Sequence, residues 1–554
     1  MMSELFGRSR RLCAVNLTNI AHSTAALAFP ENRLVDRLRT SPAEARNRLL
    51  PNELQSFDKW HSWDPKPSNH PWLSDANLLA ARHFNDKFLT KMVRQYGGSQ
   101  AKNRAYGFVG NLANNMTMRA LPLRRQGYRV SLYQHPQDRM VMSQPGWEFY
   151  GHALTSKEAN IDHLRKDGVV LPDLADTFTI PEASQQRVGE LASMATTTFA
   201  WNWQKSAAPK FIRQRDLLLW PSYFTFVDLL AKLQRYDCLL AAQAPYLAYL
   251  SNRPYLAAQT GGDLWLESAR HDAFGNLQRL SYRSAAAILA TNPWAYSNAR
   301  RYGFKHVLYV PLIIDTDRYS PGPPAQRESW QAQVGGDFFA LVTARIDSTW
   351  KGSHIGFEGF RRFSSRNPGA RLVVVGWGNE AGEIETFRAA GLAGKVVTLP
   401  IMGKPKLIDC LRSADCLIDQ FTIGYYGATA LEALSTGLPV TMNLLRSQYD
   451  ALCPTGAPPT LDARSADDVD DALERLYSSH EERSRVGRAS RQWIKENHSV
   501  DVWGDVYGAL LNAVASGARF DFRSSPLARR LTRDELNYHS SCLDHAPKFP
   551  NYTI

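Results

Sequence analysis

The chain has 554 residues, of which 44% are hydrophobic and 21% are charged. This length exceeds what one hydrophobic core normally serves, so two domains are expected. The composition excludes a disordered chain, and no apolar run approaches the ~18–20 residues that a membrane-spanning helix needs. The apolar stretch near the N-terminus is short and interrupted by polar residues, so no signal peptide is predicted.

The six cysteines are scattered and form no C-x-x-C pair, which predicts neither a zinc site nor a disulfide framework. A reducing, cytoplasmic location is therefore expected. The net charge of +12 is concentrated in residues 1–130, which hold 20 Lys or Arg and 9 Asp or Glu. This basic segment could contact an anionic membrane at its inner face or an acidic glycan, although an ordinary solvated surface explains it equally well. No nucleic-acid-binding motif is present, so no such partner is expected.

Residues 1–100 show no regular pattern. Three Pro and three Trp between Trp60 and Asp75 favour an ordered loop or lid within this basic extension. From Ala105 a strand, a helix to about Gln126 and a second strand form a βαβ unit. These two strands are expected at 105–110 and 128–133, and later ones at 238–242, 255–260, 286–291 and 306–310. The pattern predicts a Rossmann-like domain over residues 101–320.

A Pro-rich segment without periodicity, residues 311–330, joins this domain to a second one. Its strands are expected at 338–344, 371–376, 395–399, 416–419 and 438–442, and its helices at about 353–366, 380–391, 404–414 and 428–436. Strands that are apolar on both faces are typical of parallel sheets between helix layers. We predict a second Rossmann-like domain over residues 321–515 and a tail, 516–554, that packs back on the first domain. The fold class is α/β, with two doubly wound domains facing a cleft that is the default ligand site.

Charged residues and glycines follow two strands of the second domain. Arg345 lies just past the first strand and Lys351 precedes the next helix, and two cations near a strand end can neutralise a pyrophosphate. After the fourth strand, Gly424 and Gly427 allow close backbone approach at a helix N-terminus, which attracts anions. Glu432, just over one turn into that helix, can accept hydrogen bonds from a ribose diol. Arg345 and Lys351 are candidate catalytic residues, and the candidate residues for binding a nucleoside diphosphate with its attached group are Asp419, Gly424, Tyr425, Gly427, Ala428, Thr429 and Glu432.

Three runs resemble the retaining glycosyltransferases of family 4, whose fold is called GT-B: R-I-D-S-T-W-K-G (345–352), V-V-V-G-W-G (373–378) and G-Y-Y-G-A-T-A-L-E-A-L-S-T-G-L-P-V (424–440). The resemblance covers about 338–500 and is fainter over 105–320. It implies that Arg345 and Lys351 bind the diphosphate of a nucleotide sugar and that Glu432 holds its ribose. It also implies transfer to a glycan or lipid-linked acceptor, by analogy in bacterial surface polysaccharide biosynthesis.

The chain departs from this family at two places. The first glutamate of the E-x7-E motif, which normally contacts the donor sugar, corresponds to Gly424 and is missing. Asp419 and Gln420 are nearby polar candidates for this contact. In the first domain, the position of a histidine found in many relatives corresponds to the run Thr260-Gly261-Gly262-Asp263, which contains none.

Several first-domain residues are candidates for sugar or acceptor contacts. Gly261 and Gly262 can let the backbone approach a sugar, and Asp263 can bind a hydroxyl, although a tight turn with a capping Asp is an equal alternative. Asn111 and Asn114 follow the first strand, as does Asn115. Polar residues in such loops are also common without a ligand.

Other motifs are set aside. The run Gly376 to Ala381 matches the dinucleotide pattern G-x-G-x-x-A, but Glu380 and Glu383 would repel a pyrophosphate there. Asp315-Thr316-Asp317 is formally D-x-D but lies in the linker, so no metal or other cofactor is expected. Trp201, Trp203 and Trp220 could stack on sugars, although core packing is more common. Two alternatives to a glycosyltransferase remain: a nucleotide-sugar epimerase, and a catalytically inactive GT-B module that binds nucleotide sugars.

Overall fold

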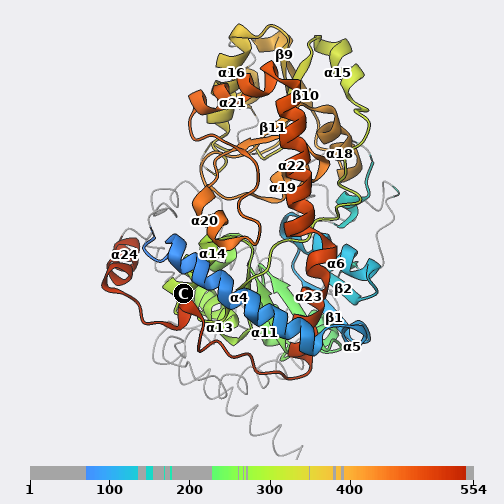
Figure 1. The fold of residues 1–554 in the computed structure, drawn as a ribbon. Coiled ribbons are helices and arrows are strands. Elements are labelled where there is room, and N and C mark those ends of the chain that lie inside the picture. Colours follow the sequence, from blue (N-terminus) through green and yellow to red (C-terminus); the bar gives the residue numbers. More distant parts are fainter. Residues whose placement is uncertain are drawn as a thin grey trace, which may run out of the picture.

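The computed structural model describes residues 70–134, 145–151, 153, 168, 175–177, 227–259, 261–265, 267–269, 273–348, 350–378, 382–387 and 392–544. These residues form two α/β units, drawn one above the other in Figure 1, and each is built on a parallel sheet. The predicted class of two tandem doubly wound domains is confirmed. Residues 1–69, Thr260 and the three tryptophans at 201, 203 and 220 lie outside the described residues.

The first sheet has seven parallel strands in the order β3-β2-β1-β4-β5-β6-β7. The chain adds strands on one side of β1 and then returns to add the others on its opposite side, as in Rossmann-like sheets. The strands are β1 (Ala105–Val109), β2 (Arg129–Gln134), β3 (Ala175–Thr177), β4 (Cys238–Ala242), β5 (Tyr255–Ala258), β6 (Ile288–Ala290) and β7 (Val307–Tyr309).

Helices cover both faces of this sheet. They are α4 (Asp75–Tyr96), α5 (Ser99–Lys102), α6 (Asn115–Arg125), α10 (Val227–Leu233), α11 (Pro245–Leu250), α12 (Gly262–Trp265), α13 (Ala273–Ser284) and α14 (Trp294–Arg301), with short 3-10 turns η5 (Leu112–Asn114), η7 (Pro145–Glu148) and η11 (Glu267–Ala269). Phe108 and its neighbour Leu240 belong to one buried cluster, whereas Val109 and Leu239 belong to the other. This alternation follows from the two-residue period of a strand buried on both sides.

The second sheet has six parallel strands in the order β10-β9-β8-β11-β12-β13. They are β8 (Phe338–Val342), β9 (Ala370–Val375), β10 (Val396–Leu399), β11 (Cys416–Ile418), β12 (Val440–Met442) and β13 (Leu461–Asp462). The helices are α15 (Arg327–Val334), α16 (Ser353–Arg366), α17 (Glu383–Phe387), α18 (Lys404–Ser413), α19 (Ala428–Thr436), α20 (Arg446–Leu452), α21 (Ala466–Ser478) and α22 (His480–His498), with the 3-10 turn η13 (Ala393–Lys395). The bounds of α16 and α19 agree with the sequence-based expectation, and α15 begins within the segment expected to be an irregular linker.

The chain returns to the first domain at Ser499 and not at residue 515. Ser499 ends α22 and caps α23 (Val500–Ala515), whose buried residues, among them Tyr507 and Leu510, pack in a first-domain core cluster with strands β4 and β5. A bridge between Ile314 and Ser499 places the two crossings between the domains side by side. The predicted second-domain boundary was wrong here because α22 and α23 are nearly contiguous helices, so the sequence shows no linker between them.

Part of the N-terminal extension is a packed helix. Helix α4 lies against α23 in Figure 1 and also contacts α20 of the second domain. The Asn85 side chain pairs with both the N–H and the C=O of Tyr309, at 2.9 and 3.0 Å, and Arg82 donates to the Pro454 carbonyl. This part of the N-terminal extension therefore joins the helical layer and contacts both domains.

The described part of the C-terminal tail packs on the first domain. It contains η14 (Pro526–Ala528) and α24 (Arg533–Asp544). Arg300 of α14 forms two hydrogen bonds with the Glu535 carboxylate, at 2.8 and 2.7 Å, and both side chains are 3% exposed. Such a bidentate pair fixes the tail geometrically. Within the described ranges, no helix is both long and apolar enough to cross a membrane.

Candidate active site

The loop after β8 carries Arg345 and Lys351 and is held by Asp347. The Asp347 backbone N–H donates to Ser353 Oγ at 2.9 Å, and its carboxylate accepts the Trp350 N–H at 2.7 Å. Arg345 forms an ion pair with Asp347 at 2.8 Å. These bonds shape the loop that leads into α16 and fix where the two predicted cations lie.

Gly352 completes this loop in the left-handed conformation, with φ of +66°, and a Cβ there would lie 2.9 Å from Thr422 Oγ1. The glycine therefore allows the β8 loop to pack against the chain that follows β11. The Phe421 N–H donates to the Lys351 carbonyl at 2.7 Å, which joins the two loops directly.

Lys351 and Asp419 meet at this junction of loops. Lys351 Nζ donates to Gln420 Oε1 at 2.7 Å. Burial lowers the pKa of Lys351, and the nearby Asp419 carboxylate opposes that shift. Burial also raises the pKa of Asp419, and Lys351 opposes it. The structure thus brings together one predicted catalytic residue and one predicted donor-binding residue.

Several polar atoms at this edge lack hydrogen-bond partners. Among the described residues, both carboxylate oxygens of Asp419 and the Nε of Arg345 are buried and unpaired, and so is Thr343 Oγ1 at the end of β8. Buried polar atoms in native proteins are nearly always satisfied by protein, water or ligand. The carboxyl ends of β8 and β11 therefore have unused capacity to bind a polar ligand.

The loop from Gly424 to Gly427 has a backbone conformation that a glutamate at position 424 would not permit. Gly424 has φ of +79°, and a Cβ there would lie 2.8 Å from Leu445 Cγ. A Glu side chain at this position would be strained and would displace Leu445. The missing first glutamate is thus accompanied by a loop conformation that suits glycine.

Tyr425 does not have a free side chain for donor binding. It is 3% exposed, its hydroxyl donates to Gln448 at 3.1 Å, and its ring stacks on Trp294 of the first domain at 6.2 Å. Its carbonyl accepts a hydrogen bond from the Gln420 amide. The Tyr425 side chain therefore serves the contact between the domains.

The start of α19 remains partly open. Gly427 caps the helix, and it is partly exposed together with Ala428 and Thr429, whereas the residues on either side are buried. N–H groups of a first helical turn have no partner within the helix and attract anions. This end of α19 follows the same strand, β11, as Asp419, so both lie at the carboxyl edge of the second sheet.

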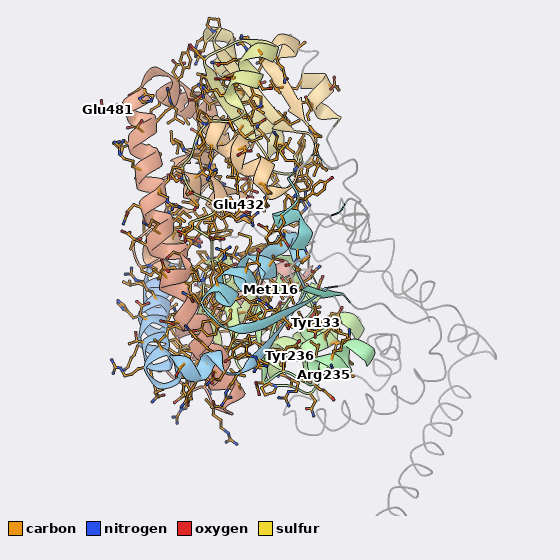
Figure 2. All side chains as sticks on the ribbon, turned by 90° about the vertical axis from the view of Figure 1, so that its right-hand side faces the viewer. Met116, Tyr133, Arg235, Tyr236, Glu432 and Glu481 are labelled. Carbon is orange, nitrogen blue, oxygen red and sulfur yellow. The ribbon has the colours of Figure 1, made fainter. Side chains whose placement is uncertain are left out.

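Glu432 is engaged by a lysine that sequence reasoning did not identify. Lys404 Nζ donates to both Glu432 carboxylate oxygens, at 2.5 and 2.6 Å, and the Glu432 side chain is 1% exposed. Burial raises the pKa of Glu432, and Lys404 opposes this. Figure 2 places Glu432 at the junction of the two domains. A ribose can contact this carboxylate only after the packing that covers it shifts.

The candidate asparagines after β1 in the first domain form hydrogen bonds with neighbouring residues of the same domain. The side-chain Oδ1 of Asn111 accepts the N–H groups of Met116 and Thr117, and its Nδ2 donates to Asn114 Oδ1 at 2.8 Å. Asn114 in turn donates to Glu148 at 3.0 Å. These asparagines hold the start of α6, which explains their presence without a ligand.

The Gly261–Asp263 run forms a capped turn at the end of β5. The Asp263 carboxylate accepts the N–H groups of Gly261 at 3.0 Å and Gln243 at 3.2 Å, and the Tyr282 hydroxyl at 2.8 Å. Gly262 begins α12. Of the two interpretations considered for Asp263, the capping residue is the one that these bonds support.

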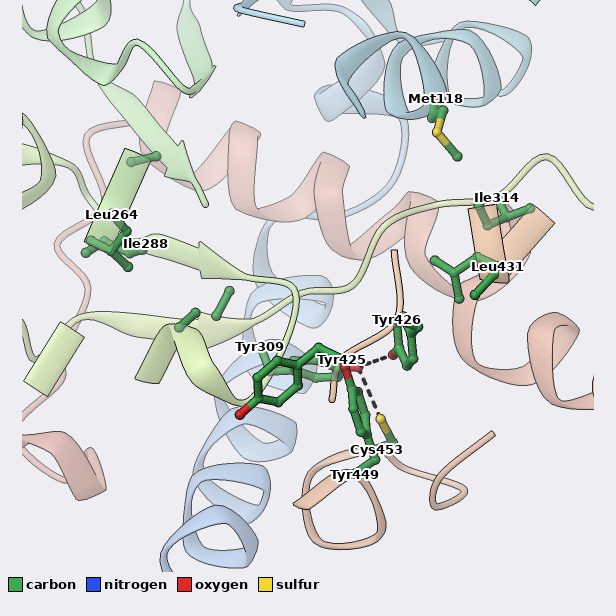
Figure 3. Close-up of a cluster of buried hydrophobic side chains, with 14 of the residues drawn as sticks. Met118, Leu264, Ile288, Tyr309, Ile314, Tyr425, Tyr426, Leu431, Tyr449 and Cys453 are labelled. Atoms are coloured by element: carbon green, nitrogen blue, oxygen red, sulfur yellow. Dashed lines mark hydrogen bonds between the residues drawn. The ribbon is translucent and has the colours of Figure 1, made fainter. Parts of the chain in front are cut away.

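A cluster of aromatic side chains joins the domains behind the Gly424–Gly427 loop. Figure 3 shows the Tyr309 hydroxyl near Tyr426 and Cys453, at 3.4 and 3.2 Å. Tyr426 stacks on Tyr449 and also bonds His498 Nε2 at 3.2 Å. Burial lowers the pKa of His498 to about 4. The donor-side loop is therefore anchored to β7 of the first domain and to the end of α22.

The motifs set aside have structural roles. In the run 376–381, Gly378 has φ of +118°, and a Cβ there would lie 2.5 Å from the Ile346 carbonyl oxygen. Trp377 Nε1 donates to the Thr343 carbonyl. This part of the run therefore packs against the β8 loop. Asp315 forms an ion pair with Arg125. Across the described ranges, no group of three or more His, Cys, Asp or Glu has the geometry to hold a metal ion. Cys238, Cys410, Cys416 and Cys453 are free buried thiols.

Sequence reasoning did not identify four residues of this region, because their sequence signals were weak: Asp347, Lys404, Trp147 and Glu148. Asp347 lies within the quoted R-I-D run and could have been noticed as a loop cap. Lys404 is the first residue of a predicted helix and belongs to no motif, and Trp147 and Glu148 lie in a stretch whose elements were not assigned. Their roles depend on contacts between distant segments.

Comparison with known proteins assigns a class to the second domain. Residues 326–493 match the family model described as Glycosyl transferases group 1. The match runs from α15 to α22 and contains every predicted donor-side residue. The second domain is therefore a glycosyltransferase domain of group 1.

Individual relatives agree with this class. The chain is 26% identical over 245 residues to mannosylfructose-phosphate synthase of Agrobacterium fabrum, covering 42% of this chain and 53% of that protein. It is 29% identical over 195 residues to D-inositol 3-phosphate glycosyltransferase of an Arthrobacter species, covering 34% and 45%. The chain thus spans about half the length of the curated relatives it matches.

One solved structure extends the fold likeness to both domains. Sucrose-phosphate synthase from Thermosynechococcus elongatus superposes with a TM-score of 0.50 at 14% identity, over 75% of this chain and 100% of that chain. At this identity the likeness concerns the fold alone.

Proposed function

We propose that this chain is a retaining glycosyltransferase of family 4 that uses a nucleoside-diphosphate sugar as donor. The observation that carries the proposal is the set of groups at the carboxyl ends of β8 and β11. Arg345, Lys351 and the partly open start of α19 supply positive charge, and the Asp419 carboxylate, which has no hydrogen-bond partner among the described residues, can accept sugar hydroxyls. A group 1 glycosyltransferase domain contains all of these groups.

In the proposed reaction the bond between sugar and phosphate breaks through an oxocarbenium-like state. Arg345, Lys351 and the N–H groups at Ala428 and Thr429 stabilise the charge that develops on the departing diphosphate. The leaving phosphate takes the proton of the acceptor hydroxyl on the same face of the sugar, so the anomeric configuration is retained. No side-chain nucleophile takes part. Asp419 takes over the sugar contact that the glutamate missing at Gly424 would make.

The acceptor is proposed by analogy to be a glycan or a lipid-linked sugar of a bacterial surface polysaccharide. The names of two curated relatives add phosphorylated sugars and polyols as further acceptor candidates. All of these present a hydroxyl group as nucleophile, so the same donor chemistry serves each of them.

The test begins with a screen of UDP-, GDP- and ADP-sugars for thermal stabilisation, since a ligand at 100 times its Kd stabilises the folded state by about 2.7 kcal/mol. The stabilising donor is then incubated with each acceptor class, and nucleoside diphosphate release and the anomeric configuration of the product are measured. Release with a retained anomer is expected. An inverted product contradicts the retaining mechanism, and binding without transfer to any acceptor identifies an inactive module. Formation of a sugar isomer without acceptor identifies an epimerase.

The proposed transfer needs no metal ion, because Arg345 and Lys351 neutralise the diphosphate. We expect activity to be unchanged after treatment with EDTA and removal of the chelator. Loss of activity that Mn²⁺ or Mg²⁺ restores would contradict this part of the proposal.

The basic N-terminal quarter is proposed to contact an anionic membrane surface from the cytoplasmic side. Within its described part, Arg124 and Arg129 line a surface hollow of about 540 Å³ together with Arg235 and Tyr236. In Figure 2 Arg235 and Tyr236 lie in the first domain, away from Glu432. Sedimentation with vesicles containing anionic lipid, but not with neutral vesicles, is expected at low salt. Equal sedimentation with both would exclude an electrostatic contact.

A further inference from the structure

The buried ion pair between Lys404 and Glu432 has an unusual setting. Lys404 is the first residue of α18 and Glu432 lies in the second turn of α19, and their side chains are 5% and 1% exposed. Lys404 Nζ donates to both carboxylate oxygens. A buried pair of this kind is costly to desolvate and is weak evidence for a stabilising role alone. Its position at the predicted ribose site calls for a functional explanation.

Lys404 is covered from the first domain by Trp147. Its ammonium lies 4.3 Å from the centre of the Trp147 ring, a favourable cation–π geometry. The Trp147 indole N–H donates to the Met402 carbonyl at 2.6 Å, two residues before Lys404. A Cβ at Gly403 would lie 1.7 Å from the Tyr150 carbonyl, so only glycine permits this approach of the two segments.

The turn that carries Trp147 is itself tied to the junction between the domains. Glu148 accepts hydrogen bonds from Arg318 at 2.9 Å, from Tyr319 at 3.1 Å and from Asn114. Tyr319 belongs to the chain between the domains, and its carbonyl accepts a bond from Ser435 of α19. The position of Lys404 is therefore set by residues of both domains.

We propose that Lys404 is the positioning residue for the Glu432 carboxylate in ribose recognition, and that Trp147 covers the Lys404 ammonium from the first domain. The proposal rests on the proposed function, because it concerns the same donor site. A carboxylate offers about four lone-pair positions, and Lys404 uses two of them. The other two suit the adjacent hydroxyls of a ribose. Because Glu432 is 1% exposed, binding of the ribose requires the packing around this carboxylate to shift while Lys404 stays on it.

The physical reason for the lysine is the burial of Glu432. A buried carboxyl without a cation takes up a proton, and one oxygen then becomes a donor and loses part of its accepting capacity. With Lys404 in place the group remains a carboxylate with its plane fixed by two bonds. Replacement of the lysine should therefore remove selectivity for the diol and not simply weaken all binding.

The test compares the binding of ribonucleoside and 2′-deoxyribonucleoside diphosphates by calorimetry, using the nucleotide found in the donor screen. The wild type is expected to prefer the ribonucleotide about tenfold, since one hydrogen bond to a charged group is lost in the deoxy form. Lys404→Met is expected to reduce the preference to within about twofold, and Lys404→Arg to keep most of it. Lys406→Met, the same change on the same helix at a partly exposed position, is the matched control and should keep the full preference.

The outcomes separate this inference from the proposed function. If the wild type binds no nucleoside diphosphate, the proposed function fails. If it binds one with the expected preference and Lys404→Met keeps that preference, Lys404 does not position Glu432 and the inference is overturned. Lys404→Gln, which is neutral but still able to donate a hydrogen bond, replaces the Met variant if that protein does not fold. An unchanged preference in Lys404→Gln overturns the inference equally.

Discussion

The carboxyl edges of the two sheets differ in how their polar side chains are satisfied. In the first domain the predicted contact residues Asn111 and Asp263 are held by several hydrogen bonds within their own loops. In the second domain, both carboxylate oxygens of Asp419 and the Nε of Arg345 are buried and have no hydrogen-bond partner among the described residues. Satisfied polar groups shape loops, whereas unsatisfied ones mark where a ligand or water completes the structure.

The largest expected effect is at Lys351. Lys351→Ala should lower turnover by about 10²–10³-fold, because one preorganised group that stabilises the leaving diphosphate is lost. The protein should remain folded, as judged by circular dichroism and thermal unfolding. Lys406→Ala on helix α18 serves as the control. Transfer at a near wild-type rate would contradict the assignment of donor binding to the carboxyl edge of the second sheet.

A second effect concerns a satisfied buried group, His498. Burial lowers its pKa to about 4, below the ~6.5 of an unfolded histidine, so the unfolded chain takes up the proton first. Its contribution to stability is complete above pH 6.5 and is lost as the pH falls from 6.5 to 4, by about 3 kcal/mol.

Thermal unfolding across this pH range is the measurement. His498→Asn should be less stable than the wild type at pH 7 and should show a flatter decline toward pH 4. His354→Asn, at an exposed position of α16, should decline as the wild type does. If His498→Asn follows the wild-type curve in shape, the histidine is not held neutral in the folded protein.

A third prediction tests the first-domain edge directly. Asp263→Ala leaves the N–H groups of Gln243 and Gly261 and the Tyr282 hydroxyl without their acceptor. Unfolding free energy should fall by about 1–3 kcal/mol, and donor affinity should be unchanged. A loss of donor affinity at constant stability would show that this edge also contacts the ligand and would remove the contrast between the domains.

The smallest effect on stability is expected at Asp419. Burial raises the pKa of this carboxyl, so its ionised form opposes folding and its removal should cost little. Asp419→Asn should unfold within about 2 °C of the wild type while binding the donor sugar about tenfold more weakly. A large drop in thermal stability with unchanged donor binding would mean that Asp419 is structural, like Asp263.

The sequence alone predicted the architecture well, for physical reasons that are local. Apolar runs bounded by polar turns located β4 at 238–242, and the pattern after Gly352 located α16 at 353–366. The second-domain motifs were also readable, since Arg345, Lys351 and the α19 glycines lie beside strand ends. The crossing at Ser499 was missed because two capped helices follow each other there without a linker.

Only the tertiary structure decided which side chains pair with one another. Lys404 and Glu432 are 28 residues apart and come from different helices, and the Trp147 indole bonds a carbonyl 255 residues away. No local pattern encodes such contacts, because they depend on how two sheets and their helices are placed. The sequence offered Asp419 as a donor-binding residue and Asp263 as a possible sugar or acceptor contact, with a capping role as its alternative. Only the packed chain showed that Asp263 accepts several hydrogen bonds within its own domain, whereas Asp419 has no hydrogen-bond partner in the described part of the chain.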